Sequence, residues 1–574
     1  MQSIAYSKTI GEAFLRRYQQ NGARMAYMVK KDGAWRPVTY AENYQTVRRL
    51  TCGLMNLGVK KGERVSILAN TSLAWTQFDM AILGSGGITV PIYPTNTPED
   101  CAYILNHAEI GTMFVDDYKN LLKIASISSQ CPALKTVIVS FDVSPKDVKG
   151  GFQVIHWNKL HDDGLNSEGK FGHRFEENLK GCKPDDVFTI CYTSGTTGLP
   201  KGVVLTHDAI VSTMEDTHKV IVQPGFATEE ELLLAFLPMS HILGKWESLL
   251  PHFLGWSQAF AESLDTLLAN LGEVKPTLWV SVPRVFEKAY SRINTMALEG
   301  PPVKKAMFQW AVKTGKDFLA ALDKGSVPPM LKLEYALASK VVFSKIKARF
   351  GGRLKFCVSG SAPLSPDIQR FFTAAGIIIY EGYGLTETCA PVSVNLPNAN
   401  RVGSVGKLMP EVLCRIAEDG EILLKSRKCV REYYKNPDAT AESLRDGWFY
   451  TGDIARMDED GYFFIVDRKK DMILVSGFNV YPNEIEAVVA MHPGVLEVAA
   501  VGVPDQKSGE AVKIFVVKKD AELTADVLIA HCRQQLTGYK VPSQVEFRND
   551  LPKTNVGKIL RRELRDEERK KVAA

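Results

Sequence analysis

The stretch at residues 192–202 reads YTSGTTGLPKG and holds three glycines, four Ser or Thr hydroxyls and one lysine. Two runs rich in β-branched and aromatic residues flank it, at 186–191 and 203–205, and both are typical of buried strands. The glycines let successive backbone N–H groups surround an anion, and Lys201 adds a positive charge suited to phosphate. The stretch differs from a Walker A loop, which ends in Gly-Lys-Ser/Thr. It predicts a polyphosphate-binding loop of another kind, although a glycine-rich surface turn has a similar composition.

Length and composition indicate a large soluble globular protein. The 574 residues predict about three or four structural units, and 45% of them are hydrophobic and 24% charged. A net charge of +5 argues against a dedicated nucleic-acid binder and is compatible with peripheral attachment to an anionic membrane surface. The ten cysteines include no Cys-x2-Cys pair, which suits reduced thiols. Neither a signal peptide nor an apolar run of 18 residues is present, so we expect a cytoplasmic protein, with the inner face of the membrane as a peripheral location.

Strand and helix patterns alternate between residues 64 and 139, starting with an apolar run at 64–69 and a helix pattern at 73–84. A hairpin is predicted before them, at 26–40. Alternation of this kind predicts an α/β fold with mostly parallel, stacked sheets and helices on both faces. Residues 142–182 are polar and glycine-rich, and we expect them to form a surface excursion.

A histidine and a tryptophan follow the strand predicted at 232–237. His241 ends the tetrapeptide Pro-Met-Ser-His, and Trp246 lies on a long apolar helix pattern. A lone histidine is more often structural, and an apolar helix is often only core, so the residues alone leave both roles open. An alkyl chain would need such apolar surface, because each buried CH₂ contributes about 0.8 kcal/mol.

Three further motifs come directly after predicted strands. The turn at 359–363, SGSAP, has small residues that let a flat base lie against the backbone. In EGYGLTET at 381–388, Tyr383 can stack on a purine, and Thr386 and Glu387 can serve a phosphate and Mg²⁺. Asp453 offers two carboxylate oxygens to ribose hydroxyls, the alternative being a turn or helix-cap residue.

The phosphate-loop string resembles the signature of the acyl-adenylate-forming superfamily, which contains acyl-CoA synthetases, luciferases and peptide-synthetase adenylation domains. The likeness extends from about residue 30 to the end of the chain, with every motif in order. The segments VPRVFEK at 282–288 and GGRLKFCVSGSAPLS at 351–365, the helical stretch 301–350 and the last fifth of the chain resemble long-chain fatty acyl-CoA synthetases (AMP-forming). This resemblance implies ATP-dependent activation of a long-chain fatty acid through acyl-AMP, transfer to coenzyme A, and a requirement for Mg²⁺.

The resemblance also implies roles for single residues. Lys558, Thr386 and Glu387 are the implied catalytic residues, and Glu387 is also the implied metal ligand. Residues implied to contact ATP or coenzyme A are Thr193, Ser194, Gly195, Thr196, Thr197, Gly198, Lys201, Gly360, Ser361, Ala362, Glu381, Gly382, Tyr383, Asp453, Arg468 and Gly477.

The acyl site and the domains follow from the same resemblance. His241, Trp246 and Gly384 are implied to line the acyl site, with Trp246 as its gate. The implied domains are an N-terminal acyl- and ATP-binding domain at 1–468, containing a small β-subdomain, and a mobile α+β lid at 469–574. Lys470 is the implied hinge between them.

Three details of the sequence remain to be placed. Ser361 stands where many superfamily members have glycine, a mild departure that should not block binding. Residues 425–434 depart from the more usual glycine-containing version, which affects the expected loop geometry there, and no catalytic role is expected in this segment. The basic tail at 561–571 is expected to be a solvated helix end, the alternative being contact with anionic lipid. A homodimer is compatible with the sequence.

Two other functions compete with a long-chain ligase. The first is an acyl-adenylate-forming enzyme with another acid, medium-chain or aryl, or with an acceptor other than coenzyme A. The second is a nucleotide-binding or scaffolding protein without catalysis. The presence of Lys201, Glu387, Asp453, Arg468 and Lys558 argues against the second function.

Overall fold

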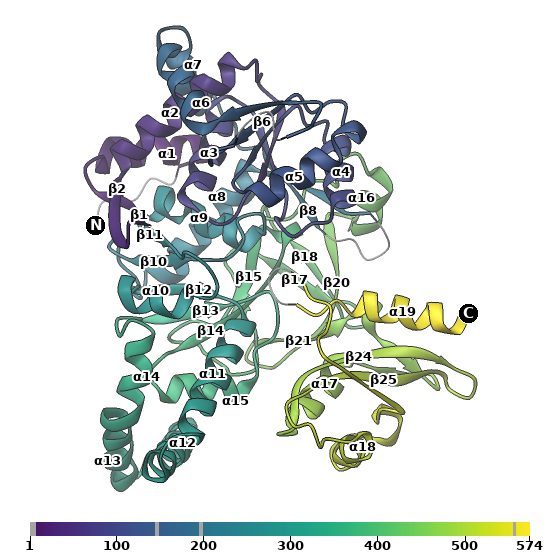
Figure 1. Cartoon of the computed structure of the whole chain (residues 1–574). Helices are drawn as coiled ribbons and strands as arrows, with labels where there is room; N and C mark the ends of the chain where they lie inside the picture. Colours follow the sequence, from purple (N-terminus) through teal and green to yellow (C-terminus); the bar gives the residue numbers. More distant parts are fainter. Residues whose placement is uncertain (1–6, 144–147, 194–198, 555–557, 574) are drawn as a thin grey trace.

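The computed structural model describes residues 7–143, 148–193, 199–554 and 558–573. Five residues of the predicted phosphate loop lie outside the described residues: Ser194, Gly195, Thr196, Thr197 and Gly198. The predicted α/β architecture is confirmed, with a large N-terminal part of stacked sheets and a smaller C-terminal part beside it (Figure 1).

The first sheet has seven strands in the order β7-β6-β5-β3-β4-β8-β9. All neighbouring pairs are parallel except β8–β9, and the central strands are buried on both faces, as their continuous Val, Ile and Leu runs require. Its strands are β3 (Arg64–Leu68), β4 (Ile88–Pro91), β5 (Thr112–Val115), β6 (Thr136–Val139), β7 (Gln153–His156), β8 (Val187–Thr193) and β9 (Lys201–Thr206). The helices between them are α3 (Leu73–Gly84), α4 (Pro98–His107) and α5 (Tyr118–Ser126), the first two as predicted.

The expectation of a surface excursion at 142–182 is wrong. This segment supplies the edge strand β7 and two helices, α6 (Trp157–Asn166) and α7 (Glu168–Lys180), that pack on α2 (Tyr40–Asn56). Phe171, Phe175 and Leu179 recur at four-residue spacing and are buried, a helical pattern that the polar composition obscures. Close packing explains a glycine here, because a Cβ on Gly164 would lie 1.8 Å from the backbone oxygen of Arg49.

Two smaller sheets continue the N-terminal part. The four-stranded sheet, β10-β11-β1-β2, contains the predicted hairpin, whose turn residues Asp32 and Gly33 both have positive φ. The five-stranded sheet runs β12-β13-β14-β15-β16. The strands are β1 (Met25–Lys31), β2 (Ala34–Thr39), β10 (Leu232–Ala235), β11 (Ser257–Phe260), β12 (Leu278–Ser281), β13 (Phe356–Ser359), β14 (Ile379–Leu385), β15 (Ala390–Val394) and β16 (Lys407–Leu408).

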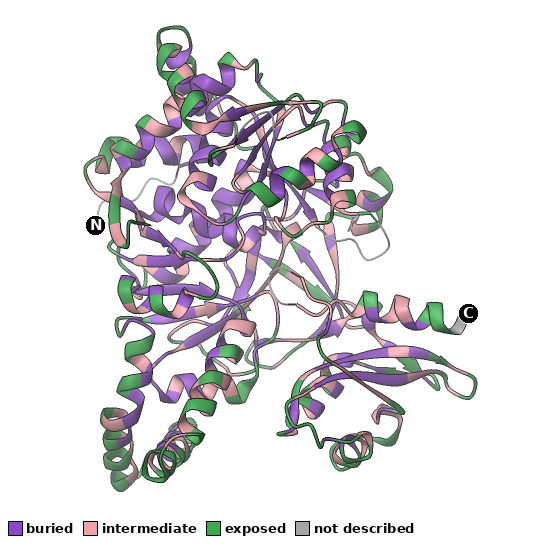
Figure 2. Ribbon diagram, viewed as in Figure 1, coloured by how far each residue is buried: buried purple, intermediate pink, exposed green. Residues whose placement is uncertain are grey.

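The remaining N-terminal helices differ strongly in burial. Helix α9 lies inside the molecule, whereas α12 and α13 project from it and are mostly exposed (Figure 2). These helices are α1 (Ile10–Asn21), α8 (His207–Thr217), α9 (Ile242–Leu254), α10 (Leu267–Val274), α11 (Pro283–Leu298), α12 (Pro302–Asp323), α13 (Pro329–Ala338), α14 (Ser344–Arg349) and α15 (Pro366–Ala374).

Two further sheets complete the chain. The small β-subdomain contains β17 (Leu413–Ile416), β18 (Glu421–Lys425), α16 (Pro437–Ser443), β19 (Leu444–Arg445), β20 (Trp448–Met457) and β21 (Phe463–Arg468). The C-terminal part contains β22 (Ile473–Val475), β23 (Phe478–Val480), α17 (Pro482–Ala490), β24 (Val495–Asp505), β25 (Gly509–Lys518), α18 (Ala525–Arg533), β26 (Gln544–Arg548) and α19 (Arg561–Ala573). It has its own apolar core. The boundary after residue 468 stays a prediction.

Candidate active site

The ends of the phosphate loop are held by an antiparallel hairpin. Thr193, at the end of β8, lies opposite Lys201, at the start of β9. The edge strand β9 then pairs with a segment far along the chain, since Tyr434 N–H donates to the Gly202 carbonyl at 2.7 Å. The two strand ends that flank the predicted loop are therefore both fixed by backbone pairing.

Tyr433 connects this hairpin to the EGYGLTET motif. Its hydroxyl donates to Oε1 of Glu387 at 2.9 Å, and Lys201 Nζ lies 5.2 Å from the centre of its ring. Burial raises the pKa of Glu387, and the Tyr433 hydroxyl opposes that rise. Sequence reasoning assigned no role to 425–434. The available signal was the aromatic pair Tyr433–Tyr434 inside a charged stretch.

The predicted adenine turn follows β13 and is tied to β14. Oε2 of the buried Glu381 accepts a hydrogen bond from Leu364 N–H at 2.9 Å. Burial raises the pKa of Glu381 to about 7. Ser361 has φ of 71°, in the region that favours glycine, which explains why a glycine would fit this position. Gly360 and Ala362 flank it in the turn.

Tyr383, Asp453 and Arg468 form one cluster. The Tyr383 hydroxyl donates to Asp453 Oδ2 at 2.7 Å, and Arg468 Nε lies 3.5 Å from Oδ1. Asp453 and Arg468 stand opposite each other on β20 and β21. Burial and the Asp453 carboxylate raise the pKa of Tyr383.

The two glycines beside Tyr383, Gly382 and Gly384, differ in how much space a side chain would have. A Cβ on Gly384 would lie 2.2 Å from the Ala390 carbonyl oxygen, so the β14–β15 hairpin excludes a side chain there. Gly382 is less confined, with its nearest such contact, to the Ser393 carbonyl oxygen, at 3.2 Å. Thr386 and Glu387 follow in a single 3₁₀ turn, Thr386–Thr388.

Lys558 brings the C-terminal part into this site. The lysine is half-buried, and its backbone N–H donates to Thr554 Oγ1 at 3.1 Å. Burial, together with the positive charge of Arg468, lowers the pKa of Lys558 to about 7. Burial and the charge of Lys558 lower the pKa of His241 to about 4. The charge of Asp453, also in the N-terminal part, acts on the pKa of Lys558 in the opposite direction to that of Arg468.

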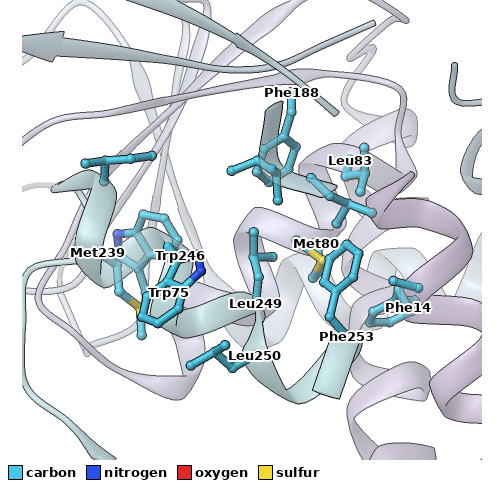
Figure 3. Packing of buried hydrophobic residues seen from close by; sticks show 14 of the residues in the cluster. Phe14, Trp75, Met80, Leu83, Phe188, Met239, Trp246, Leu249, Leu250 and Phe253 are labelled. Atoms are coloured by element: carbon cyan, nitrogen blue, oxygen red, sulfur yellow. The ribbon is translucent and has the colours of Figure 1, made fainter. Parts of the chain in front are cut away.

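His241 and Trp246 lie on the buried helix α9. His241 caps the helix, its Nδ1 accepting from Leu243 N–H at 3.2 Å. Trp246 packs in the main apolar core together with Trp75 and Met239 (Figure 3). One turn of the same helix holds Lys245, which forms a fully buried salt bridge with Asp79 of α3 at 2.8 Å.

The predicted hinge and coenzyme A residues lie at the start of the C-terminal part. Lys470 is in the 3₁₀ turn Lys469–Asp471, and its carbonyl accepts from Arg565 of α19 at 3.2 Å. Gly477 has φ of 83° and open space around it, in the turn between β22 and β23. The two parts also meet through a salt bridge between Arg284, at the start of α11, and Glu497, on β24.

The basic tail is less solvated than expected. Arg561 is largely buried and pairs with Asp467 and Glu486, and Arg565 pairs with Asp471 at 2.9 Å. Helix α19 consequently packs on β24 with these cations turned to internal partners.

The site suits a magnesium ion carried by a nucleotide. Mg²⁺ in such sites takes one or two carboxylates, water and substrate phosphates. Glu387 is a half-buried carboxylate linked through Tyr433 to the strand that follows the predicted phosphate loop, and within the described ranges no group of three or more His, Cys, Asp or Glu could hold a metal alone. Across the same ranges, no helix combines the length and apolarity needed to cross a bilayer.

Comparisons with known proteins agree with this geometry. The AMP-binding enzyme family matches residues 14–434, and its C-terminal domain matches residues 484–558. The chain belongs to the AMP-binding enzyme family. Among relatives of this AMP-binding enzyme, a long-chain-fatty-acid–CoA ligase of Salmonella typhimurium is 37% identical, with 90% of this chain and 87% of that protein covered. The long-chain-fatty-acid–CoA ligase FadD15 of Mycobacterium bovis is 35% identical over 82% of this chain and 76% of its own length.

Solved structures share the fold. The anthranilate CoA ligase AuaEII, in complex with anthranoyl-AMP, matches with a TM-score of 0.79 at 23% identity, over 99% of this chain and 98% of that one. A fatty acyl CoA synthetase of Mycobacterium tuberculosis matches with a TM-score of 0.66 at 25% identity, over 98% of each chain.

Proposed function

We propose that this AMP-binding enzyme is a long-chain fatty acid–CoA ligase that forms AMP and pyrophosphate. The observation that carries the proposal is the cluster in which the Tyr383 hydroxyl donates to Asp453 at 2.7 Å and Arg468 lies 3.5 Å from the same carboxylate. The names of the relatives support the long-chain acid and coenzyme A as substrates.

In the first half-reaction, a carboxylate oxygen of the fatty acid attacks the α-phosphorus of ATP. The bond from the α-phosphorus to the bridging oxygen breaks, and pyrophosphate leaves with the electron pair. Lys558 would bridge the carboxylate and the α-phosphate, and Thr386 with the phosphate loop would hold the leaving group. Fixed charges of this kind stabilise a transition state that gathers negative charge.

Three residues would hold the nucleotide. Asp453 and Arg468 would position the ribose and phosphates, and Tyr383 would stack on the adenine. Glu387, held by the Tyr433 hydroxyl, would carry Mg²⁺, which supplies charge neutralisation at the phosphates when bound.

In the second half-reaction, the sulfur of coenzyme A attacks the acyl carbonyl carbon. The carbon–oxygen bond to AMP breaks, AMP leaves with the electron pair, and the thiol proton goes to solvent. Lys558 would then obstruct the thiol, so the C-terminal part would rotate about Lys470 and bring Gly477 to the pantetheine path. A domain motion of this kind takes microseconds to milliseconds.

The test separates the two half-reactions. Lys558→Ala should lower the rate of acyl-AMP formation by at least about a hundredfold while largely sparing thioester formation from preformed acyl-AMP. Lys570→Ala, an exposed lysine of α19, is the matched control and should leave both rates unchanged. Equal loss of both half-reactions would remove Lys558 from this role.

The acid is tested separately, by AMP release with ATP, Mg²⁺ and coenzyme A across straight-chain acids from acetate to stearate. A maximum among the long-chain acids supports the proposal. The second candidate, an aryl-acid ligase, is favoured by the fold match to the anthranilate ligase, and anthranilate belongs in the same series. Turnover without coenzyme A would indicate another acceptor.

The proposed location is the cytoplasm, with peripheral attachment to the inner face of the membrane. A homodimer stays a prediction, which sedimentation velocity of the full chain decides.

A further inference from the structure

The positive charge of this protein is concentrated in one projecting element. Residues 302–349, here called the arm, contain ten Lys or Arg and three Asp or Glu, so the arm carries +7 and the rest of the chain carries −2. The arm comprises α12, α13 and α14 and projects at one end of the molecule (Figure 1).

Most of this charge is unpaired. Of the arm's cations, all of which lie in the described range 199–554, only Lys316 forms a salt bridge, with Asp367 at 3.4 Å. One of the three acidic residues, Asp323, is itself neutralised by Arg370 outside the arm. Lys305, Lys313 and Lys316 are spaced by eight and three residues, which puts them on one face of α12, and all three are exposed.

Helix α13 adds an apolar stripe that faces solvent. Met330, Leu333 and Leu337, at positions i, i+3 and i+7, lie on one face of the helix and are 66%, 67% and 53% exposed. The inner side of the helix is occupied by Ala338 and by Tyr335, whose ring stacks on Phe318 of α12. The exposed stripe is therefore surplus to the packing of the arm. Glu334 lies beside it on α13, and the exposed Lys332 and Lys340 lie on the same helix and in the turn that follows it.

We infer that the arm is a docking surface for an anionic lipid bilayer, with Met330, Leu333 and Leu337 entering the headgroup region and the lysines contacting lipid phosphates. Charge and apolarity together select this occupant. A basic surface attracts anionic lipid more strongly with each Lys or Arg near it, and exposed apolar side chains on the same helix pair give insertion. An acidic protein would complement the charge but would leave the apolar stripe without an equivalent partner.

The tail helix α19 is a weaker candidate for this contact. Its Arg561 and Arg565 pair with internal acids, and Lys571 pairs with Glu568 at 2.7 Å. The positive charges that make α19 look basic in the sequence are therefore largely neutralised by acidic side chains in the folded protein. The inference rests on the proposed function in one respect. A long-chain fatty acid partitions into the bilayer, so an enzyme bound there would meet its proposed substrate.

The test is flotation of the full-length protein with phosphatidylcholine vesicles containing about 30% phosphatidylglycerol, without substrate, at low and high salt. Wild-type protein should float with these vesicles, less so at high salt, and should not float with pure phosphatidylcholine. Lys305→Glu/Lys313→Glu and Leu333→Ser/Leu337→Ser should each lower the partition coefficient by about tenfold or more.

Matched variants control for charge and for apolar area. Arg569→Glu/Lys570→Glu reverses two exposed charges of α19, and Leu413→Ser/Met457→Ser removes two exposed apolar side chains of the β-subdomain. Both should float like the wild type. Ligase activity on detergent-dispersed acid should be unchanged in the arm variants, which shows that they fold.

Several outcomes would overturn the inference. These are absence of wild-type flotation, arm variants that bind like the wild type, or an equal loss in the α19 control. A change in sedimentation coefficient in the arm variants, with flotation unchanged, would make the arm a self-association surface. Flotation is measured without turnover, so vesicle binding by a protein that fails the ligase assay would overturn the proposed function and leave this inference standing.

Discussion

At the scale of single residues, Tyr433 is a side chain of the candidate site to which the sequence analysis gave no role. Its hydroxyl holds one oxygen of Glu387 at 2.9 Å, and its ring lies beside Lys201. If Glu387 holds the metal as proposed, its carboxylate gains from a fixed orientation, because the side chain is then already ordered before the nucleotide binds. Tyr433 is a positioning residue for Glu387.

Tyr433→Phe removes this hydrogen bond and keeps the ring. We expect the kcat/KM for Mg²⁺-ATP in acyl-AMP formation to fall about tenfold, since one hydrogen bond to a charged group contributes about 1.5 kcal/mol. The Mg²⁺ concentration for half-maximal rate should rise as well, which loss of stability alone would not produce. The control is Tyr434→Phe, whose ring lies beside His107. If both variants behave alike, Glu387 does not depend on Tyr433.

At the scale of elements, a buried histidine joins α1 to α8. The Ile10 N–H donates to His207 Nδ1 at 3.2 Å, and His207 N–H donates to the Asp186 carbonyl at 3.1 Å. Burial lowers the pKa of His207 to about 4 from its ordinary value of 6.5. The folded protein therefore keeps this imidazole neutral in a pH range where the unfolded chain binds a proton.

This shift makes folding sensitive to acid. Above pH 6.5 both states are neutral at His207 and the contribution to stability is complete. As the pH falls from 6.5 to about 4 the unfolded state alone gains the proton, and about 3 kcal/mol of stability is lost. His207→Asn, which keeps an acceptor, should lower stability near neutral pH but reduce its further decline toward pH 4.

Urea midpoints measured at several pH values between these limits check the prediction. His173→Asn replaces an exposed histidine of α7 and should follow the wild-type curve. An unchanged pH dependence in His207→Asn would show that other groups, such as His241 and the buried His252, account for the acid response.

At the scale of the whole molecule, the orientation of the C-terminal part is held by contacts that cross to the N-terminal part. Glu497 of β24 pairs with Arg284 of α11 and also with Lys553 at 2.7 Å. Rotation of the C-terminal part would separate Glu497 from Arg284. It would not separate Glu497 from Lys553, because these two residues both belong to the C-terminal part and would move together. The Arg284 pair would therefore favour the orientation described here, in which it is formed.

Glu497→Gln should slow acyl-AMP formation by about fivefold and leave thioester formation from preformed acyl-AMP nearly unchanged, because only one orientation loses a charge pair. Glu522→Gln, an exposed position of the same part, should change neither rate. Single-turnover measurements of each half-reaction give the ratio of the rate of acyl-AMP formation to the rate of thioester formation. An unchanged ratio would show that Arg284 and Glu497 do not bias the orientation.

Local features of this protein were predictable from the sequence, whereas features that depend on long-range packing were not. Strand and helix positions such as 73–84 and 98–107, and the order of the nucleotide motifs, were predictable because side-chain periodicity and turn glycines act within a few residues. The segment 142–182 was wrongly expected to lie on the surface, because its helices bury Phe175 and Leu179 against α1, α2 and α3, which come far earlier in the chain.

The sequence by itself determined the α/β class, the phosphate-loop string and the residue types available for acyl-AMP chemistry. The tertiary structure alone decided that β8 and β9 are antiparallel, that Tyr433 holds Glu387, that Tyr383 donates to Asp453, and that most of the arm's cations form no salt bridge while those of α19 pair with acids. Each of these is a contact, or a missing contact, between groups distant in the chain. Such contacts depend on topology and packing, which local patterns do not encode.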